Sequence, residues 1–158
     1  EAGAAPPITP IDLAALAQRV VAELAPGAIA RGQTLGLDVP AGATQVPGNE
    51  ALLGALLRNL VDNALRYSPD GAEVRVAITR TDGQVQLLVD DSGPGLSEAD
   101  LARLGERFFR VLGSGQSGSG LGWSIVRRIA AAHGATVAVG RSAALGGLAV
   151  AVNWPAGD

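Results

Sequence analysis

Apolar residues recur along this chain at two spacings, one typical of helices and one typical of strands. We expect helices over residues 13–24, 49–66 and 121–133. Asp12 and Asn49 stand where the first two helices would have their N-caps, and Gly134 stands where the third would have its C-cap. Pro26 and Gly27 predict that the first helix ends at residue 24, because proline disrupts hydrogen bonding inside a helix.

Shorter segments alternate between apolar and polar residues, as strands with one buried face do. We expect strands over residues 8–11, 34–39, 44–46, 73–80, 84–90, 136–139 and 148–152. Asp82-Gly83 is the strongest hairpin signal, Gly146-Gly147 predicts a second turn, and Gly42 is expected to turn the third strand back onto the second. Helices interleaved with strands, followed by hairpins, predict an α/β fold in which a mixed sheet carries helices on one face.

The length and charge of the chain limit what it can be. Its 158 residues, 47% of them hydrophobic, suffice for one domain with its own core. Residues 1–7 are expected to be a linker from a missing upstream segment, and residues 8–158 the domain. The formal charge is −3 without a block of like charges, so nucleic acid is not an expected partner. No uninterrupted apolar run reaches about 18 residues, so the chain is not expected to span a membrane.

The predicted helix over residues 49–66 has a polar face. Asn59, Asn63 and Arg66 fall within roughly 60° of one another on a helical projection. Asparagine costs about 0.5 kcal/mol relative to alanine inside a helix, so two of them beside an arginine suggest a function. An amide oxygen is a hard, neutral ligand that suits Mg²⁺ together with nucleotide phosphates. A solvated surface face would explain the same residues.

A carboxylate followed by glycines comes after the strand expected over residues 84–90. In Asp91-Ser-Gly-Pro-Gly95, an ionised Asp91 could accept a hydrogen bond from an exocyclic amino group such as that of adenine. Gly93 and Gly95 would let a flat base approach the backbone. The alternative is an ordinary Pro-Gly turn.

A glycine-rich segment precedes the last predicted helix. Ser97 is expected to begin a short helix, and residues 113–120 are too polar and too rich in glycine to pack, which predicts a loop. In Gly118-Ser-Gly-Leu-Gly122, backbone N–H groups near a helix N-terminus could bind phosphate. A flexible loop ending in a helix has the same composition. A P-loop is excluded, because the chain contains no lysine.

In this order and spacing, the three segments resemble the N, G1 and G2 boxes of the catalytic ATP-binding domain of bacterial sensor histidine kinases. Arg107-Phe-Phe-Arg110 lies where that family carries its F box. The similarity extends from about residue 8 to residue 154. It implies the Bergerat fold, a two-layer α/β sandwich whose mixed, mostly antiparallel sheet has three helices on one face.

The resemblance also implies roles for individual residues. Asn63 would ligate Mg²⁺, with Asn59 beside it near the phosphates, and Asn59 and Arg110 would be the catalytic residues. Arg66 would contact phosphate, Tyr67 would line the nucleotide, and Asp91 would receive the adenine amino group. The remaining cofactor-binding residues would be Gly93 and Gly95 in the base pocket and Gly118, Gly120, Leu121 and Gly122 at the hinge of an ATP lid. Trp123, where an aliphatic residue is commoner, is expected to pack rather than stack.

The only histidine, His133, is expected to cap the end of the last helix. The phosphoacceptor would then lie on a histidine-bearing dimerisation domain of the same parent protein, which would pass the phosphate to a response regulator. The resemblance places this chain in the cytoplasmic part of an inner-membrane protein.

Two other interpretations remain open at this point. Related ATPases and serine kinases of the same fold carry a glutamate four residues before the metal-binding asparagine, where this chain has Asn59. A neutral amide cannot act as that general base. A non-catalytic nucleotide sensor would have the same motifs.

Overall fold

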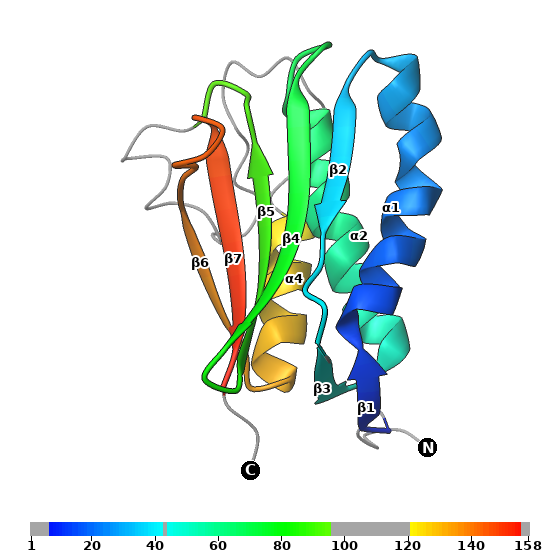
Figure 1. The fold of residues 1–158 in the computed structure, drawn as a ribbon, viewed down its shortest axis with the longest axis vertical. Coiled ribbons are helices and arrows are strands. Elements are labelled where there is room, and N and C mark those ends of the chain that lie inside the picture. Colours follow the sequence, from blue (N-terminus) through cyan, green and yellow to red (C-terminus); the bar gives the residue numbers. More distant parts are fainter. Residues whose placement is uncertain (1–6, 43, 96–120, 156–158) are drawn as a thin grey trace.

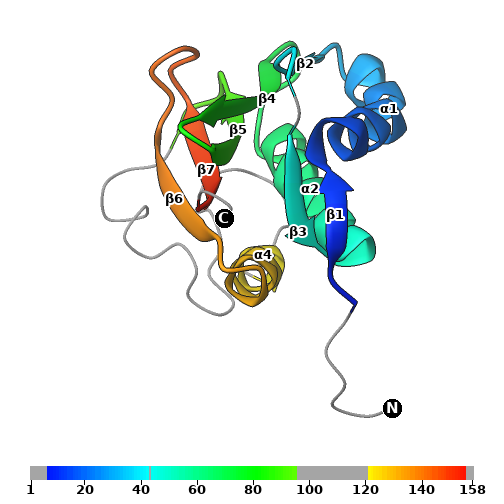
Figure 2. The ribbon, with the colours of Figure 1, turned by 60° about the horizontal axis from the view of Figure 1, so that its bottom comes forward.

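The computed structural model describes residues 7–42, 44–95 and 121–155. The elements in this part are β1 (Thr9–Asp12), α1 (Leu13–Ala30), β2 (Thr34–Asp38), β3 (Gln45–Gly48), α2 (Glu50–Arg66), β4 (Glu73–Thr81), β5 (Gln84–Asp91), α4 (Leu121–Ala132), β6 (Thr136–Arg141) and β7 (Leu148–Trp154). A five-stranded sheet forms one layer and the three described helices form the other (Figures 1 and 2). The predicted two-layer α/β architecture is confirmed.

The strands of the large sheet lie in the order β2-β4-β5-β7-β6. Only the β2–β4 pair is parallel, so this sheet is mixed and mostly antiparallel, as predicted. The hairpin between β4 and β5 turns at Asp82 and Gly83, which have φ values of 53° and 80°. Two successive positive φ values are what a tight two-residue hairpin requires, and aspartate followed by glycine meets that need cheaply.

The hydrophobic core lies between the sheet and the helices. Alternate residues of β4, namely Val74, Val76 and Ile78, are buried, and the residues between them are more exposed. Among the helices, α2 contributes mainly leucine and buries Leu53, Leu56, Leu57 and Leu60. Trp123 is 5% exposed and belongs to this core, which confirms that it packs.

The predicted pairing of residues 44–46 with residues 34–39 is wrong. β3 instead pairs antiparallel with β1, so that Ile11 faces Val46, and both side chains are buried. A bond of 3.1 Å from the Leu13 nitrogen to the Thr44 carbonyl oxygen continues this contact. β2 takes a place at the edge of the large sheet, parallel to β4. The turn at Gly42 was a signal from neighbouring residues alone. Burial of Ile11 and Val46 instead favours β1 as the partner of β3.

The predicted end of the first helix is also wrong, because α1 continues through Pro26 to Ala30. Proline removes one hydrogen bond, and tertiary contacts hold the following turn in place. Ala28 is buried, and the backbone N–H of Arg31 caps the helix by donating to the Ala28 and Ile29 carbonyl oxygens. The Arg31 side chain extends from this end of α1 to α2.

By length and a mean hydropathy of 1.3, α1 is apolar enough to cross a membrane. In this structure its apolar face is part of the core, since Leu16, Ala17 and Val20 are buried against the neighbouring elements. Its Glu23 pairs with Arg58 of α2 at 2.7 Å on the solvent side. Core packing therefore accounts for part of the apolar composition of α1, of which 28% is buried.

Candidate nucleotide-binding site

The polar face predicted for α2 is present. Asn59 and Asn63 are half-buried one turn apart, and leucines on the opposite side of the helix form the core. The Asn59 amide group donates a hydrogen bond of 2.7 Å to the Ala55 carbonyl oxygen. This bond directs the amide nitrogen at its own helix and leaves the side-chain oxygen for a ligand. Arg66 pairs with Asp62 at 3.0 Å, one turn back on the same helix.

The carboxylate of Asp91 lies where β5 ends. Asp91 is 6% exposed. Its Oδ1 atom accepts hydrogen bonds from the backbone nitrogens of Gly93 at 3.0 Å and Leu148 at 3.1 Å. Burial raises the pKa of the Asp91 carboxyl, and neighbouring Asp90 raises it further, whereas the two backbone N–H groups lower it. Two bonds on one oxygen fix the orientation of the carboxylate, which is how a selective acceptor for an amino group is built.

The glycines beside Asp91 meet steric requirements that the sequence could only suggest. Gly95 has a φ of 73°, which other residues rarely adopt. An added Cβ at Gly93 would lie 3.2 Å from Asp91 Oδ1 and 3.3 Å from Ser68 Oγ. Both contacts are tight, so a side chain at Gly93 would press on the Asp91 carboxylate.

Gly147 packs against this candidate site, although the sequence indicated only a turn residue there. Its backbone nitrogen donates to the Asp91 carbonyl oxygen at 3.0 Å. An added Cβ would overlap the Asp91 carboxylate and carbonyl oxygens and lie 2.8 Å from the Gly93 nitrogen. Only glycine fits between the β6–β7 hairpin and the Asp91 turn. The Gly-Gly pair was the one local signal available.

Ser68 is the second residue that the sequence analysis missed. It follows the C-terminal end of α2 and is 1% exposed. Its hydroxyl group has no hydrogen-bond partner within the described part of the chain. This hydroxyl lies next to the Asp91 turn, since a Cβ added at Gly93 would be 3.3 Å from it. Since buried hydroxyl groups are normally paired, Ser68 is a notable exception on the edge of the candidate site.

In Figure 1, α2 and β5 both run toward the upper end of the molecule in that view, and α4 runs the opposite way. Ser68, two residues after α2, lies beside the Asp91 turn, so the C-terminal end of α2 is close to that turn. The approach of Asn59 and Asn63 to Asp91 stays a prediction. Arg107, Arg110, Gly118 and Gly120 lie outside the described residues, as do the helix expected from Ser97 and the loop predicted over residues 113–120. Leu121 and Gly122 are the first residues of α4, and the structure describes their backbone but not their side chains.

His133 has the capping role that was predicted. Its Nδ1 atom lies 2.8 Å from the Ile129 carbonyl oxygen, and its Nε2 atom accepts the backbone N–H of Asn49 at 3.1 Å. The second bond requires an unprotonated Nε2, so the proton is assigned to Nδ1. Both ring nitrogens are therefore occupied, and the ring joins the end of α4 to the start of α2.

The family described as "Histidine kinase-, DNA gyrase B-, and HSP90-like ATPase" matches residues 48–158 of this chain. The chain belongs to this family of ATP-binding domains, and its two-layer architecture is the Bergerat fold. β1, α1 and β2 precede the matched region, yet β2 pairs with β4 and α1 packs on α2, so they belong to the same structural unit.

The chain is 49% identical over 107 residues to the sensor protein QseC of Salmonella typhimurium, covering 68% of this chain and 23% of QseC. It is 37% identical over 148 residues to the sensor protein kinase PmrB of Pseudomonas aeruginosa, covering 92% of this chain and 30% of PmrB. The solved structure of the mycobacterial sensor histidine kinase MprB is similar with a TM-score of 0.80 at 29% identity, covering 93% of this chain and 96% of that structure. The predicted membership in the sensor-kinase type of ATP-binding domain is confirmed, while the chain spans less than a third of either sensor protein.

Proposed function

We propose that this chain binds Mg-ATP and donates its γ-phosphate to a histidine on a separate dimerisation domain of the same parent protein. Its similarity to parts of QseC and PmrB supports the proposal. The engagement of both nitrogens of its only histidine supports it as well. The chain would then be the ATP-binding half of a kinase, unable to phosphorylate itself, and a response regulator would receive the phosphate from the acceptor histidine.

The observation that carries the nucleotide assignment is the fixed carboxylate of Asp91. Its Oδ1 atom is held by two backbone N–H groups, so Oδ2 is the oxygen that would accept the adenine amino group. Gly93 and Gly95 would form the wall against the base, and Tyr67, which caps α2, would line it. Gly118, Gly120, Leu121 and Gly122 would form the hinge of the lid, as the family resemblance implies.

The amides of α2 fit a magnesium site. In the described ranges no three His, Cys, Asp or Glu side chains gather as a metal site, so neutral oxygen ligands are the ones on offer. Asn63 would hold the ion, with the Asn59 oxygen beside it, and phosphates and water would supply the remaining ligands. Bound Mg²⁺ would neutralise phosphate charge. Arg66 would contact a phosphate, and Arg110 would contact the γ-phosphate.

Asn59 favours transfer to histidine over hydrolysis or transfer to serine. A carboxylate at this position could take a proton from water or from a serine hydroxyl, and a neutral amide cannot. The Asn59 amide nitrogen is also engaged with the Ala55 carbonyl oxygen. Catalysis would then depend on alignment of the acceptor with the γ-phosphate and on charge neutralisation.

The proposal extends to the parent protein. We propose that it is anchored in an inner membrane, with this domain in the cytoplasm. The named relatives are sensor proteins, and this chain corresponds to a minor part of each. The remaining parts would carry the sensor and the acceptor histidine.

Phosphorylation in trans tests the transfer step. This chain and ATP would be mixed with a histidine-bearing helical hairpin from the same parent protein, and we expect acid-labile phosphate on the hairpin. ATP binding without phosphate on the hairpin would indicate a nucleotide sensor instead. Release of inorganic phosphate with an unmodified hairpin would indicate an ATPase.

Asn63→Ala tests the metal assignment. We expect the variant to lose the gain in ADP affinity that Mg²⁺ gives the wild-type chain, and to keep its affinity in EDTA. Calorimetric titration with Mg²⁺ and with EDTA would measure both. Asn153→Ala is the matched control, because Asn153 pairs with Gln86 at 2.9 Å on the sheet and takes no part in the site. An undiminished effect of Mg²⁺ in Asn63→Ala would refute the assignment.

A further inference from the structure

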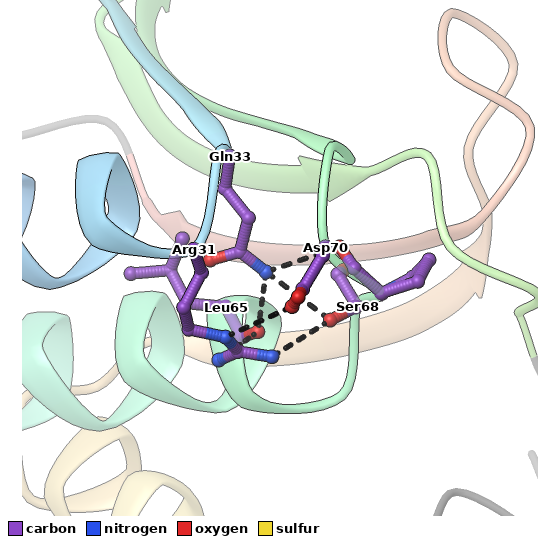
Figure 3. A network of polar contacts seen from close by, with 6 residues as sticks. Arg31, Gln33, Leu65, Ser68 and Asp70 are labelled. Atoms are coloured by element: carbon purple, nitrogen blue, oxygen red, sulfur yellow. Dashed lines mark hydrogen bonds and ion pairs between the residues drawn. The ribbon is translucent and has the colours of Figure 1, made fainter.

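A polar network outside the predicted site residues joins α1 to the C-terminal end of α2 (Figure 3). Arg31 donates to the carbonyl oxygens of Leu65 at 3.0 Å and Ser68 at 3.1 Å. The Gln33 amide group lies 2.9 Å from the Leu65 oxygen, 3.1 Å from the Ser68 oxygen and 3.3 Å from the Pro69 oxygen. Arg31 and Gln33, hereafter the Arg31–Gln33 clamp, thus grip the chain where it leaves α2.

Within the clamp, Gln33 is buried and Arg31 is half-buried. Gln33 is 5% exposed, and its side-chain oxygen has no partner among the described residues. The bonds from its amide nitrogen therefore hold this side chain in place. The last carbonyl groups of a helix lack partners within the helix, and their partial negative charge attracts a guanidinium group. Arg31 also lies 3.6 Å from Asp70, although that carboxylate is largely exposed.

The two clamp residues duplicate one another. The Leu65 and Ser68 oxygens each receive a bond from Arg31 and another from Gln33. Loss of one clamp residue would leave each of these oxygens with one side-chain donor. Loss of both clamp residues would leave each oxygen with no side-chain donor. The two losses should therefore not be additive, as is usual for residues that share partners.

The clamp reaches the candidate base pocket through Ser68. The Ser68 carbonyl oxygen is held by the clamp, while the Cα atom and hydroxyl of the same residue lie 3.5 Å and 3.3 Å from the Cβ position of Gly93. The Gly93 nitrogen in turn donates to Asp91 Oδ1. A shift at Ser68 would thus move one wall of the Asp91 pocket.

We infer that Arg31 and Gln33 are positioning residues for the nucleotide site, which act by holding Ser68 against the Asp91 turn. The inference rests on the proposed nucleotide site. Neither residue touches Asp91, so their effect is on the fraction of molecules whose pocket is correctly formed. Apparent affinity falls in proportion to that fraction.

The test is ADP binding by three variants, measured by calorimetry with Mg²⁺ and again with EDTA. Arg31→Ala and Gln33→Leu should each raise the Kd about 3-fold, and the double variant about 30-fold, more than the product of the single effects. The same losses should appear with and without Mg²⁺, because the clamp acts on the base side. Arg31→Lys keeps the charge but loses one of the two bonds, and its Kd should lie between those of wild type and Arg31→Ala.

Arg58→Ala is the matched control. Arg58 also joins the two helices through two bonds, to Glu23 at 2.7 Å and 3.1 Å, but it does not approach residues 65–70. Thermal unfolding of all variants separates stability from affinity. Arg58→Ala should leave the Kd unchanged, whatever its melting temperature, so a clamp effect on the Kd cannot come from weaker helix packing alone.

The outcomes are distinct. A wild-type chain that binds no ADP would overturn the proposed function and this inference with it. Normal ADP binding by both wild type and the double variant would overturn the inference alone. If the double variant does not fold, unchanged Kd values in both single variants would overturn it, and an increase of about 3-fold in each would support it.

Discussion

The polar groups at the two ends of α2 differ in whether they have hydrogen-bond partners. At the N-terminal end, Asn49 accepts from the Leu52 nitrogen at 3.1 Å, and its own backbone N–H donates to His133. At the C-terminal end, the Ser68 hydroxyl and the Gln33 side-chain oxygen are buried without a partner among the described residues. One end is therefore complete as it stands, and the other has hydrogen-bonding capacity left over.

In the proposed nucleotide site, the difference would separate an end that stabilises the fold from an end that faces the ligand. An unpaired buried polar group costs about 1–3 kcal/mol, which a fold seldom accepts without a use for it. The unpaired hydroxyl at the C-terminal end lies close to a carboxylate whose pKa is raised by burial. Unpaired and desolvated groups of this kind are concentrated at functional sites. Substitutions at either end of α2 test this difference.

The largest expected effect is at the ligand end, with Asp91→Asn. An asparagine can keep the two bonds from Gly93 and Leu148 but would turn an NH₂ group toward the adenine amino group. Loss of a hydrogen bond to a charged acceptor should weaken ADP binding about 10- to 100-fold. The free energy of unfolding should not fall at neutral pH, because a desolvated charge is removed. Calorimetry and urea denaturation measure the two quantities.

Asp90→Asn is the control for that change. Asp90 is 6% exposed like Asp91, but successive side chains of a strand point to opposite faces, so it faces away from the helices. Its variant should bind ADP normally. Equal losses of affinity in the two variants would contradict the assignment of Asp91.

At the other end, Gly48→Ala should lower stability without lowering affinity. An added Cβ would lie 2.6 Å from Leu53 Cδ1 and 2.7 Å from His133 Cδ2, and the His133 ring is fixed by both of its nitrogens. Overpacking of this kind costs about 2 kcal/mol. Gly140→Ala, where nothing lies within 4 Å of the new Cβ, is the control. A loss of ADP affinity in Gly48→Ala, measured where it is still folded, would break the distinction between the two ends.

The smallest effect concerns pH. In the proposed site, adenine recognition would require the ionised form of Asp91, whose pKa is raised by burial and by Asp90. Affinity should be full above that pKa and fall as the pH drops through it, beginning at a higher pH than an ordinary aspartate would give. ADP phosphates titrate equally with wild type and Asp91→Asn, so the ratio of the two Kd values isolates the carboxylate. A ratio that stays constant down to the usual aspartate range would contradict the raised pKa.

Local patterns predicted most of the fold. Apolar periodicity and capping residues located α2 and α4, and Asp82-Gly83 located the β4–β5 hairpin, because these features depend on nearby residues alone. The end of α1 and the partner of β3 were predicted wrongly. Both are set by tertiary contacts, Arg31 with α2 and Ile11 with Val46, which no local signal records.

The same division applies to the candidate site. Asn59, Asn63, Arg66 and Asp91 could be proposed because unusual residue types stand in motifs. Gly147 could not, because its role depends on its approach to Asp91 across the sheet. Gln33 and Ser68 have no motif at all, and their roles come from contacts over long separations, 35 residues in the case of the Gln33–Ser68 bond.

The bond from Leu148 to Asp91 spans 57 residues and has a consequence for assembly. Asp91, at the end of β5, gains its second backbone donor and its contact with Gly147 only when β7 has paired with β5. Contacts between such distant segments form late, after the loop between them has closed. If Asp91 binds adenine as proposed, a chain in which β7 has not yet paired with β5 would lack a complete acceptor, so nucleotide binding would report that this last strand is in place.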